Sequence, residues 1–442
     1  MNQSFTAKLT RIISLTIAVI LVLLPFHAFL SVWLASQVGH YTALRLWKEY
    51  LLAIMGLIAV VLLARDKALR TRLGEQRLIW IIGLYLLLEL FLGFTSFTHH
   101  QVSAEAVAYG LLDDTRFLFF FVLCAVIAAR DDWLRRHWRP IVLIPALVVV
   151  VFGLLQAFVL PHDVLQHFGY GLSTIPAIET VNSNAHYYRI QSTLRGANPL
   201  GAYLLFVISI LGVLLIKAKN NRNKLIYGCG GLATLVALYF TYSRGAWIGV
   251  VLAGICTLAA TIKSTRAKQL TAISLAVIIV IGGSAYLALR HNTRLENVVF
   301  HTSPHTVATT SDENHSSALV QGLHDIEHDP LGRGPGSAGP ASVYNHDRPA
   351  RIPENYFVQI GQEVGWLGLI LFILITVLMA LALWQLRSNP LALALFASLI
   401  GLSVVGLVSQ VWTDDTISYL WWGLAGIIWA QVISTAKTAE KH

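Results

Sequence analysis

The chain has 442 residues, of which 56% are hydrophobic and 12% are charged. Soluble domains carry roughly 25% charged residues, so this composition excludes an ordinary soluble protein and indicates a polytopic membrane protein. The net charge of +9 does not indicate nucleic-acid binding, because no soluble segment is large enough to gather the basic residues on one face. The cysteines, Cys124, Cys229 and Cys256, all lie in apolar runs, so we expect neither a disulfide nor a metal cluster.

Apolar runs long enough to cross a bilayer recur along the chain. A membrane core needs roughly 20 apolar residues per helix, and a chain in lipid must satisfy its backbone polar groups internally. We therefore predict an all-α fold with about twelve membrane-spanning helices. The first run follows Lys8 and Arg11, lacks a signal-peptidase site and is expected to stay attached. The predicted spans are roughly 10–36, 46–64, 78–96, 113–129, 139–160, 199–216, 225–242, 245–262, 269–288, 355–385, 390–411 and 417–435.

The distribution of Lys and Arg predicts the orientation in the membrane. Most of the 32 basic residues lie near the termini or in connections such as "RDKALRTRLGEQR" and "RDDWLRRHWR", on one side of the predicted bundle. By the positive-inside rule we expect this side of a cell (plasma or inner) membrane protein, with both termini, to be cytoplasmic. The long connections 161–198 and 289–354 then lie outside.

The second of these connections is large enough to form a small external domain. Within it, "SDENHSSALVQGLHDIEH" begins with a Ser/Asp capping pattern and has apolar residues at helical spacing, which predicts a helix. The following "DPLGRGPGSAG" predicts a break. We divide the chain into N-terminal helices (1–188), a core that includes the external connection (189–385) and a C-terminal hairpin (386–442).

Four arginines lie near the predicted outer boundary of the membrane. Arg244, in "SRGAW", lies between two apolar runs; Arg189 and Arg195 precede another span on the same side, and Arg116 lies just inside a fourth. Arginine presents a planar fork of donors that suits phosphate or pyrophosphate, so we predict a site for the anionic group of a lipid. Each arginine could instead extend to headgroups as a helix anchor, and the two aspartates before Arg116 could simply pair with it.

At these residues the chain resembles a known family. The segments "RGANPLGAYL", "SRGAWIG", "HDPLGRGPGS" and "ENYFVQIGQEVGWLGL" occur in order across roughly residues 189–370, and in them the chain is similar to the O-antigen ligases and O-antigen polymerases, which are bacterial membrane glycosyltransferases. The resemblance implies a twelve-helix fold of the lipid-dependent (GT-C-like) glycosyltransferase type with an outward-facing site. It also implies a polyprenyl-pyrophosphate-linked glycan as donor, a saccharide or glycolipid as acceptor, and a role in cell-surface polysaccharide assembly among membrane lipids. The catalytic arginines of the family carry over to Arg195 and Arg244.

The chain departs from the family pattern at one position. Ligases of this family carry a His followed by Asn, nine residues and Gly-x-x-Gly; here Asn355 is followed by nine residues and "GWLG", but Glu354 stands at the His position. A carboxylate can also accept a proton from a sugar hydroxyl, so we expect Glu354 to be the general base and Asn355 to bind substrate. Glu354 could instead only favour the start of a helix. Because of this departure, ligase and polymerase remain equal alternatives.

The remaining site predictions concern the outer connections. We expect Arg189, Arg116 and Arg333 to help bind the lipid phosphates, and His324 to contact the acceptor. His324 and His328 are four residues apart, but no third ligand stands at helical spacing, so no metal site is predicted. The sequence contains no P-loop and no compact acidic cluster such as DxD, and we expect no nucleotide or other cofactor.

The last predicted hairpin carries several aromatic and acidic residues. Because Trp and Tyr gather at membrane interfaces, we expect the aromatic residues to form an interfacial belt. Asp414 and Asp415, in "WTDDT", are expected to end a helix rather than to bind the acceptor. The aromatic residues concerned are Trp412, Tyr419, Trp421 and Trp422.

A transporter of a small or anionic solute is the alternative class. Twelve spans with both termini inside are also a common carrier layout, and Lys48 and Glu49 in "LWKEYL" could form an intramembrane pair. A carrier should place charges or broken helices near the midplane, often in two matching halves. The sequence shows no repeated halves and places the predicted outer charges at one face, which favours the enzyme.

Overall fold

The computed structural model describes residues 3–181, 184–262, 264, 266, 311–346 and 348–435. The described chain is almost entirely helical and contains one two-stranded hairpin, β1–β2. The elements up to this hairpin are α1 (Gln3–Leu23), η1 (Leu24–Phe26), α2 (His27–Val38), α3 (Tyr41–Arg45), α4 (Trp47–Arg65), α5 (Lys67–Gly74), α6 (Arg77–Thr98), α7 (Ala104–Arg130), α8 (Trp133–Phe158), η2 (Val164–Phe168), β1 (Glu179–Val181) and β2 (Asn184–Arg189). The later elements are α9 (Ala197–Lys217), α10 (Asn221–Phe240), α11 (Arg244–Thr261), α14 (Ser311–His328), η4 (Pro340–Tyr344), α15 (Tyr356–Gln385), α16 (Pro390–Gly406), η5 (Val411–Thr413) and α17 (Asp415–Thr435).

The helices confirm an all-α polytopic membrane protein. Among the described residues, eight helical segments are long and apolar enough to cross a membrane. A further apolar helix, α16, has 17 residues. The predicted span 269–288 lies outside the described residues. The eight segments are Phe5–Val38, Trp47–Arg65, Arg77–Thr98, Trp133–Phe158, Ala197–Lys217, Arg244–Thr261, Tyr356–Gln385 and Asp415–Ser434.

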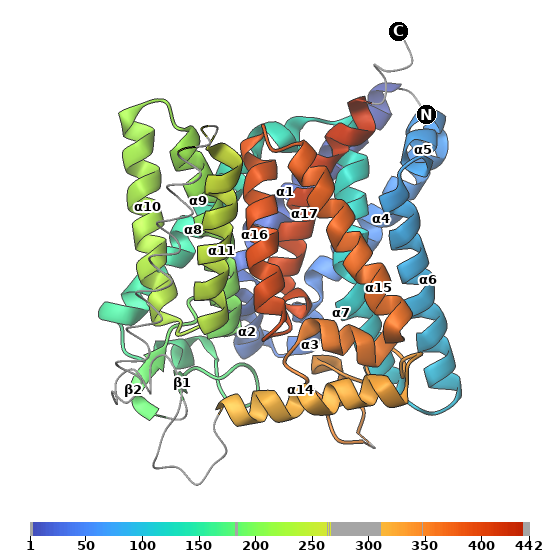
Figure 1. Cartoon of the computed structure of the whole chain (residues 1–442), viewed down its shortest axis with the longest axis vertical. Coiled ribbons are helices and arrows are strands. Elements are labelled where there is room, and N and C mark those ends of the chain that lie inside the picture. Colours follow the sequence, from blue (N-terminus) through green and yellow to red (C-terminus); the bar gives the residue numbers. More distant parts are fainter. Residues whose placement is uncertain are drawn as a thin grey trace.

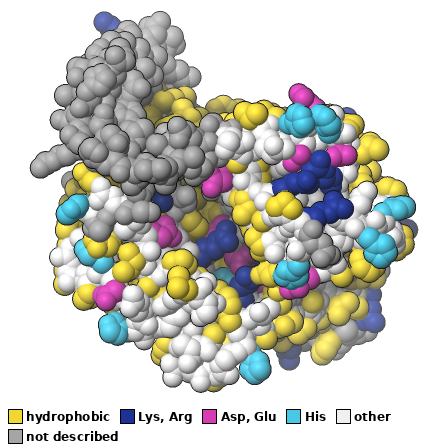
Figure 2. Space-filling view, turned by 90° about the horizontal axis from the view of Figure 1, so that it is seen from below, with side chains coloured by type: hydrophobic (Ala, Val, Ile, Leu, Met, Phe, Trp, Pro, Cys, Tyr) yellow, Lys and Arg dark blue, Asp and Glu magenta, His cyan; other side chains and the backbone are white. Residues whose placement is uncertain are grey.

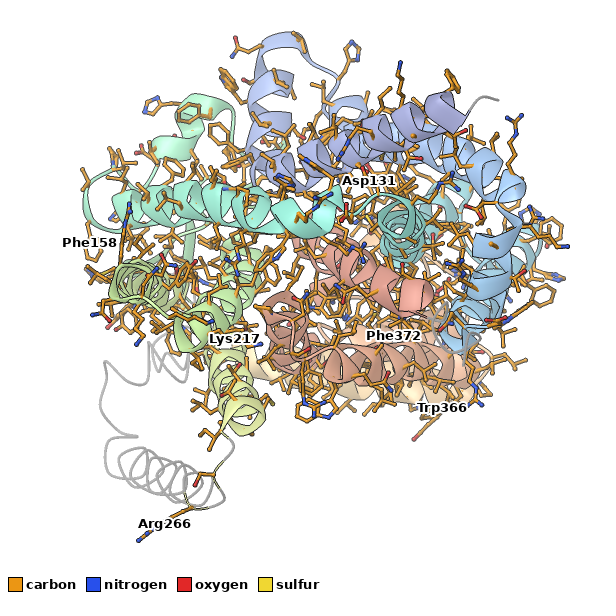
Figure 3. The ribbon with its side chains drawn as sticks, turned by 90° about the horizontal axis from the view of Figure 1, so that it is seen from above. Asp131, Phe158, Lys217, Arg266, Trp366 and Phe372 are labelled. Atoms are coloured by element: carbon orange, nitrogen blue, oxygen red, sulfur yellow. The ribbon has the colours of Figure 1, made fainter. Side chains whose placement is uncertain are left out.

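The long helices run between two opposite faces of the molecule (Figure 1). The start of α1 and the end of α17 lie at one face; β1, β2, α3 and α14 lie at the other, which we call the loop face. At the face of the termini, Asp131 lies where α1, α7 and α8 meet (Figure 3). It accepts a hydrogen bond from Ser14 Oγ at 2.9 Å and pairs with Arg11 at 3.1 Å, which ties the first helix to the bundle.

Helix α17 forms the centre of the bundle, and 89% of its most apolar stretch is buried inside the protein. It packs closely on α7 because two of its residues lack side chains: a Cβ at Gly426 would lie 2.3 Å from the carbonyl oxygen of Phe121, and one at Gly423 would lie 2.4 Å from the Phe120 ring. Small residues allow this close approach of helices in membranes. The prediction of an interfacial aromatic belt is therefore wrong, because the four side chains concerned are buried in this core: Trp412, Tyr419, Trp421 and Trp422.

The helix predicted in the second long connection is confirmed as α14, which lies across the loop face beneath α15 (Figure 1). The glycine-rich segment after it docks into the bundle. Gly336 has a φ of 81°, and its N–H donates to Glu363 Oε1 at 2.7 Å; a Cβ there would lie 2.1 Å from the Ala106 carbonyl oxygen. Helix α15 bends to receive the segment at Gly365, where φ is 66°. This docking fixes α14 and the start of α15 at the loop face.

Candidate functional site

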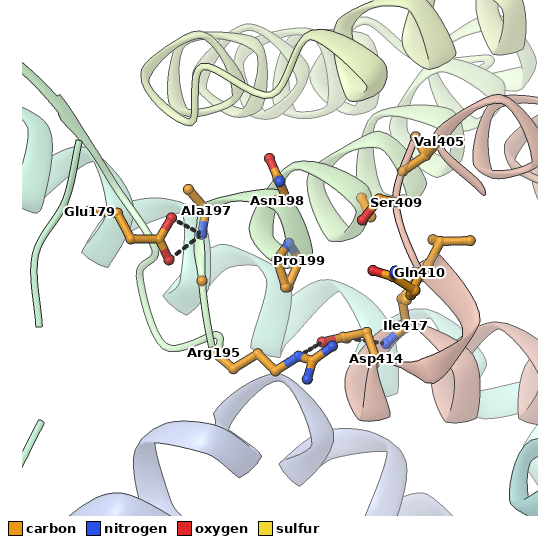
Figure 4. A pocket seen from close by; sticks show the side chains of 13 residues that line it. Glu179, Arg195, Ala197, Asn198, Pro199, Val405, Ser409, Gln410, Asp414 and Ile417 are labelled. Atoms are coloured by element: carbon orange, nitrogen blue, oxygen red, sulfur yellow. Dashed lines mark hydrogen bonds and ion pairs between the residues drawn. The ribbon is translucent and has the colours of Figure 1, made fainter. Parts of the chain in front are cut away.

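A cavity of about 280 Å³ lies at the loop face, beside the start of α9 and the segment between α16 and α17 (Figure 4). We call it the Arg195 cavity. One wall is the turn from Arg195 to Asn198, and the opposite wall is the stretch from Ser409 to Asp414. Its lining residues are Glu179, Arg195, Gly196, Ala197, Asn198, Pro199, Ala202, Val405, Ser409, Gln410, Val411, Asp414 and Ile417.

Arg195 is held in the wall of this cavity by Asp414. The side chain of Arg195 is 43% exposed, and its Nε donates to Asp414 Oδ2 at 2.9 Å. The other carboxylate oxygen of Asp414 accepts the N–H groups of Thr416 and Ile417, each at 3.1 Å, and so caps the N-terminus of α17. The prediction that Asp414 marks a helix end is confirmed. Because Asp414 is fixed by the helix, it also fixes the guanidinium, whose remaining N–H groups can face the cavity.

Arg189 and Arg244 lie near the Arg195 cavity without lining it. Arg189 Nε donates to the carbonyl oxygen of Thr241, and an Nη donates to Asn198, which lines the cavity. Burial lowers the pKa of Arg189 from its ordinary value; Glu179 opposes this shift, and the neighbouring charge of Arg244 adds to it. The two guanidiniums are therefore close enough to repel each other, as expected for arginines gathered at an anion site.

Glu354 and Asn355 lie at the start of α15, beside the segment that leads into the cavity wall. Asn355 caps this helix by accepting from Val358 N at 3.1 Å, and its Nδ2 donates to Leu407 O at 3.0 Å. Leu407 belongs to the stretch that continues into the cavity wall. The start of α11 meets this stretch as well, since a Cβ at Gly245 would lie 2.8 Å from Val408 Cγ2. Arg244 and Glu354 thus adjoin one segment, although neither lines the Arg195 cavity itself.

The backbone is strained in the three segments that meet here. Ser192, Tyr242 and Glu354 have φ values of 49°, 52° and 51°, in the left-handed region that non-glycine residues seldom adopt. Ser192 lies shortly before Arg195, Tyr242 lies shortly before Arg244, and Glu354 is itself the predicted general base. Such strain costs on the order of 1–3 kcal/mol per residue and gathers at functional sites. This backbone strain does not depend on any sequence motif, and it indicates a functional site in this region.

A second, larger cavity of about 480 Å³ shares Arg195 and Asp414 with the first. We call it the Tyr109 cavity. On the loop face, a central hollow has basic and acidic side chains at its floor (Figure 2). The residues that line the cavity are His27, Ala28, Ser31, Tyr41, Arg45, Tyr109, Asp113, Arg116, Ser173, Thr174, Ile175, Pro176, Arg195, Pro340, Ala341, Val343, Tyr344, Thr413, Asp414, Asp415 and Thr416.

Arg116 lies in the floor of the Tyr109 cavity and is fully compensated by acids. Its guanidinium pairs with Asp113 at 3.0 Å, with Glu49 at 3.3 Å and with Asp415, and its side chain is 4% exposed. Lys48, also buried, pairs with Glu49 at 3.1 Å and with Asp415 at 3.0 Å. The predicted Lys48–Glu49 contact is confirmed. These pairs link α4, α7 and α17, so the geometry gives Arg116 a structural role beneath the cavity.

Arg333 and His324 lie elsewhere, on and beside α14. Arg333 pairs with Asp325 at 3.2 Å and with Asp329 at 2.6 Å. His324 is exposed, and its ring stacks on that of His328 with 4.1 Å between centroids. Neither residue lines the two cavities described above. Among the predicted site residues, the structure therefore brings together those around Arg195 and separates these two.

Sequence reasoning missed several residues of this region. Glu179 accepts the N–H of Ala197 through both carboxylate oxygens, at 3.2 and 3.3 Å, and so holds the first turn of α9 against the cavity. Arg45 and Tyr109 line the larger cavity from α3 and α7. No periodicity or spacing links these residues; only the charge of Arg45 beside a predicted outer boundary gave a signal. Asp415, the first residue of α17, also pairs with side chains of three other helices, α2, α4 and α7.

The family comparison agrees with this geometry. The model of the O-antigen ligase family matches residues 229–373, from α10 into α15, a stretch that includes Arg244 and Glu354. Among curated proteins, none matches the chain. The family supports a membrane glycosyltransferase-like role in polysaccharide assembly. By this match, residues 229–373 of this multi-pass membrane protein are similar to the O-antigen ligase family.

Proposed function

We propose that the protein transfers a glycan from a polyprenyl-pyrophosphate carrier to an acceptor hydroxyl at the external face of the cell membrane. The observation that carries this proposal is that Arg195 lines the cavity at the loop face and that Arg189 donates to Asn198 in the cavity wall. Arg244, from a separate segment, is close enough for its charge to act on Arg189. The family match supports the same class of reaction. Both termini are then cytoplasmic, in agreement with the basic residues at the opposite face.

The arginines are suited to a leaving pyrophosphate. Guanidinium groups donate charge-assisted hydrogen bonds in pairs to phosphate oxygens. Arg195 is fixed by Asp414, and Arg189 by Thr241 and Asn198, so little reorganisation is needed when charge develops on the leaving group. In this proposal Arg244 completes the set from the first turn of α11.

The reaction itself is a displacement at the anomeric carbon. The acceptor hydroxyl oxygen forms a bond to the anomeric carbon while the bond between that carbon and the pyrophosphate oxygen breaks. The leaving pyrophosphate takes the bonding electron pair and remains on the lipid. The hydroxyl proton goes to Glu354, the general base of the proposal. No nucleotide or redox partner enters this balance, and holding the two substrates in line supplies much of the remaining rate enhancement.

Product analysis with purified protein tests the proposal. Protein in detergent is mixed with a polyprenyl-pyrophosphate-linked glycan and membrane-derived acceptor, without nucleotide. We expect elongated or ligated product and release of lipid pyrophosphate. Arg244→Ala should lose most turnover, whereas Arg136→Ala, a change of an exposed arginine near Asp132 and far from both cavities, should keep it. Full turnover by Arg244→Ala would remove that residue from the site.

The carrier alternative draws support from the buried charges in α4, α7 and α17, since ionisable groups inside membranes often mark solute pathways. Lys48 and Arg116 are, however, paired with Glu49, Asp113 and Asp415, as expected of a structural network. Uptake of a labelled anionic solute into proteoliposomes, without any product from lipid-linked glycan, would favour the carrier and contradict the transferase.

A further inference from the structure

We propose that the Tyr109 cavity binds the saccharide of the acceptor, at a place separate from the site of the pyrophosphate. The inference rests on the proposed function and adds the location of the second substrate. The cavity has a volume of about 480 Å³, within the range of roughly 300–1,000 Å³ common for ligand sites. The cavity is therefore large enough for a sugar unit of the acceptor.

The charged side chains around this cavity suit a polyol. Its lining holds three arginines and three aspartates, so the formal charges of these six residues cancel. Sugar hydroxyls donate hydrogen bonds to carboxylates and accept them from guanidiniums, and a balanced set of both suits them. The Ser173 hydroxyl adds a further donor and acceptor, whereas the hydroxyls of Thr174 and Thr416 donate to backbone carbonyls and can add only acceptors.

Aromatic rings form one side of the same cavity. The rings of Tyr109 and Tyr344 stack with centroids 4.2 Å apart and planes 17° apart. The Arg45 guanidinium lies over Tyr109, 5.6 Å from its centroid, and within the described chain no carboxylate forms an ion pair with Arg45. A ligand site commonly combines an aromatic wall with a few convergent polar groups. Tyrosine also offers an apolar face for sugar C–H groups and a hydroxyl for their oxygens.

The position of the cavity matches the geometry that the reaction requires. Arg195 and Asp414 line both cavities, so a sugar in the Tyr109 cavity lies next to a glycan whose pyrophosphate is held at Arg195. In a direct displacement the attacking hydroxyl approaches from the side opposite to the leaving group. The two cavities share this guanidinium, so the larger one is left for the acceptor beside the donor.

Separate KM measurements for the two substrates test the inference. The variants are Arg45→Ala and Tyr109→Ala, with Tyr109→Phe to keep the aromatic face and Val343→Trp to fill the rim, where Val343 is 50% exposed. We expect the Ala and Trp variants to raise the acceptor KM about tenfold, with kcat and the donor KM within about threefold of wild type. Tyr109→Phe, which loses only the hydroxyl, should raise the acceptor KM less than Tyr109→Ala does. Tyr50→Ala, at a side chain that is 54% exposed and lines neither cavity, is the matched control.

The outcomes separate the inference from the function on which it rests. If wild type gives no transfer product, the proposed function fails. If wild type is active and all variants keep the acceptor KM, or if the donor KM rises as much as the acceptor KM, the cavity is not the acceptor site. Val343→Trp keeps the test decisive even if the buried substitutions impair folding, because its side chain is added at the rim.

Discussion

Arg195 lines both the Arg195 cavity and the Tyr109 cavity. Its guanidinium has one fixed contact, to Asp414, and its other donors are available to a ligand. Arg195→Ala should reduce turnover about 100-fold, the size of effect seen when a single donor to a developing oxyanion is removed. Arg195→Lys keeps the charge but loses the planar fork, so we expect an intermediate loss. Turnover rates of the two variants check this order; a lysine variant with full activity would show that charge alone suffices.

Glu354 stands where the O-antigen ligases carry a His, and it is held in a left-handed conformation just before α15. Glu354→Gln should reduce kcat at least about tenfold, equivalent to about 1.4 kcal/mol of barrier, because the amide cannot take up the proton. Glu354→His should recover activity relative to the Gln variant, since imidazole can serve as the base. Donor affinity measured without turnover should be unchanged in both. A Gln variant with wild-type kcat would exclude Glu354 as the base.

At the scale of elements, helix α14 is held to α15 by a polar cluster around Asp325. Burial disfavours its charge, but the hydrogen bond from Gln362 and the charges of Arg333 and Arg351 hold the pKa of Asp325 below its ordinary value. A lowered pKa means that the carboxylate stabilises the folded state above about pH 4 and that this contribution is lost as the pH falls further. Asp325→Asn should therefore lower the thermal stability of α14 at pH 7 and remove this acid dependence. Hydrogen exchange of α14 at pH 3.5 and 7 measures both effects.

Helices α6, α7 and α15 share three carboxyl groups buried in the core: Glu89, Asp114 and Glu363, each 0% exposed. Among the described residues, none of the three forms an ion pair with a basic side chain, and a buried unpaired carboxylate is costly enough that the group takes up a proton instead. Glu89→Gln and Asp114→Asn should therefore leave the melting temperature within a few degrees of wild type. Arg116→Met, which leaves paired carboxylates without their cation, should cost on the order of 3–5 kcal/mol. Melting curves in detergent compare them; unfolding of both amide variants would contradict protonated carboxyls.

At the scale of the whole molecule, hydropathy and the distribution of basic residues predict the helical class, most of the spans and the face where the arginines meet. They do not distinguish a helix that faces lipid from one that faces protein, which is why Trp421 and Trp422 were expected at the interface and are instead in the core. The residues Glu179 and Arg45 belong to a hairpin and a short helix whose positions depend on tertiary packing, so no local pattern identifies them. The order of the motifs in the sequence identified Arg244 and Glu354 as candidate site residues. Only the structure shows that both adjoin the segment between α16 and α17.

The most direct test of the central claim, that these arginines bind a diphosphate, is the affinity of the purified protein for polyprenyl pyrophosphate without a glycan. Native mass spectrometry or calorimetry in detergent can compare wild type with Arg189→Ala, Arg195→Ala and Arg244→Ala, using Arg136→Ala as the control. We expect wild type to prefer the pyrophosphate over the monophosphate and each of the three changes to weaken binding about tenfold, or about 1.4 kcal/mol. Equal affinity for the two lipids, or unchanged binding in all three variants, would contradict a pyrophosphate site at these arginines.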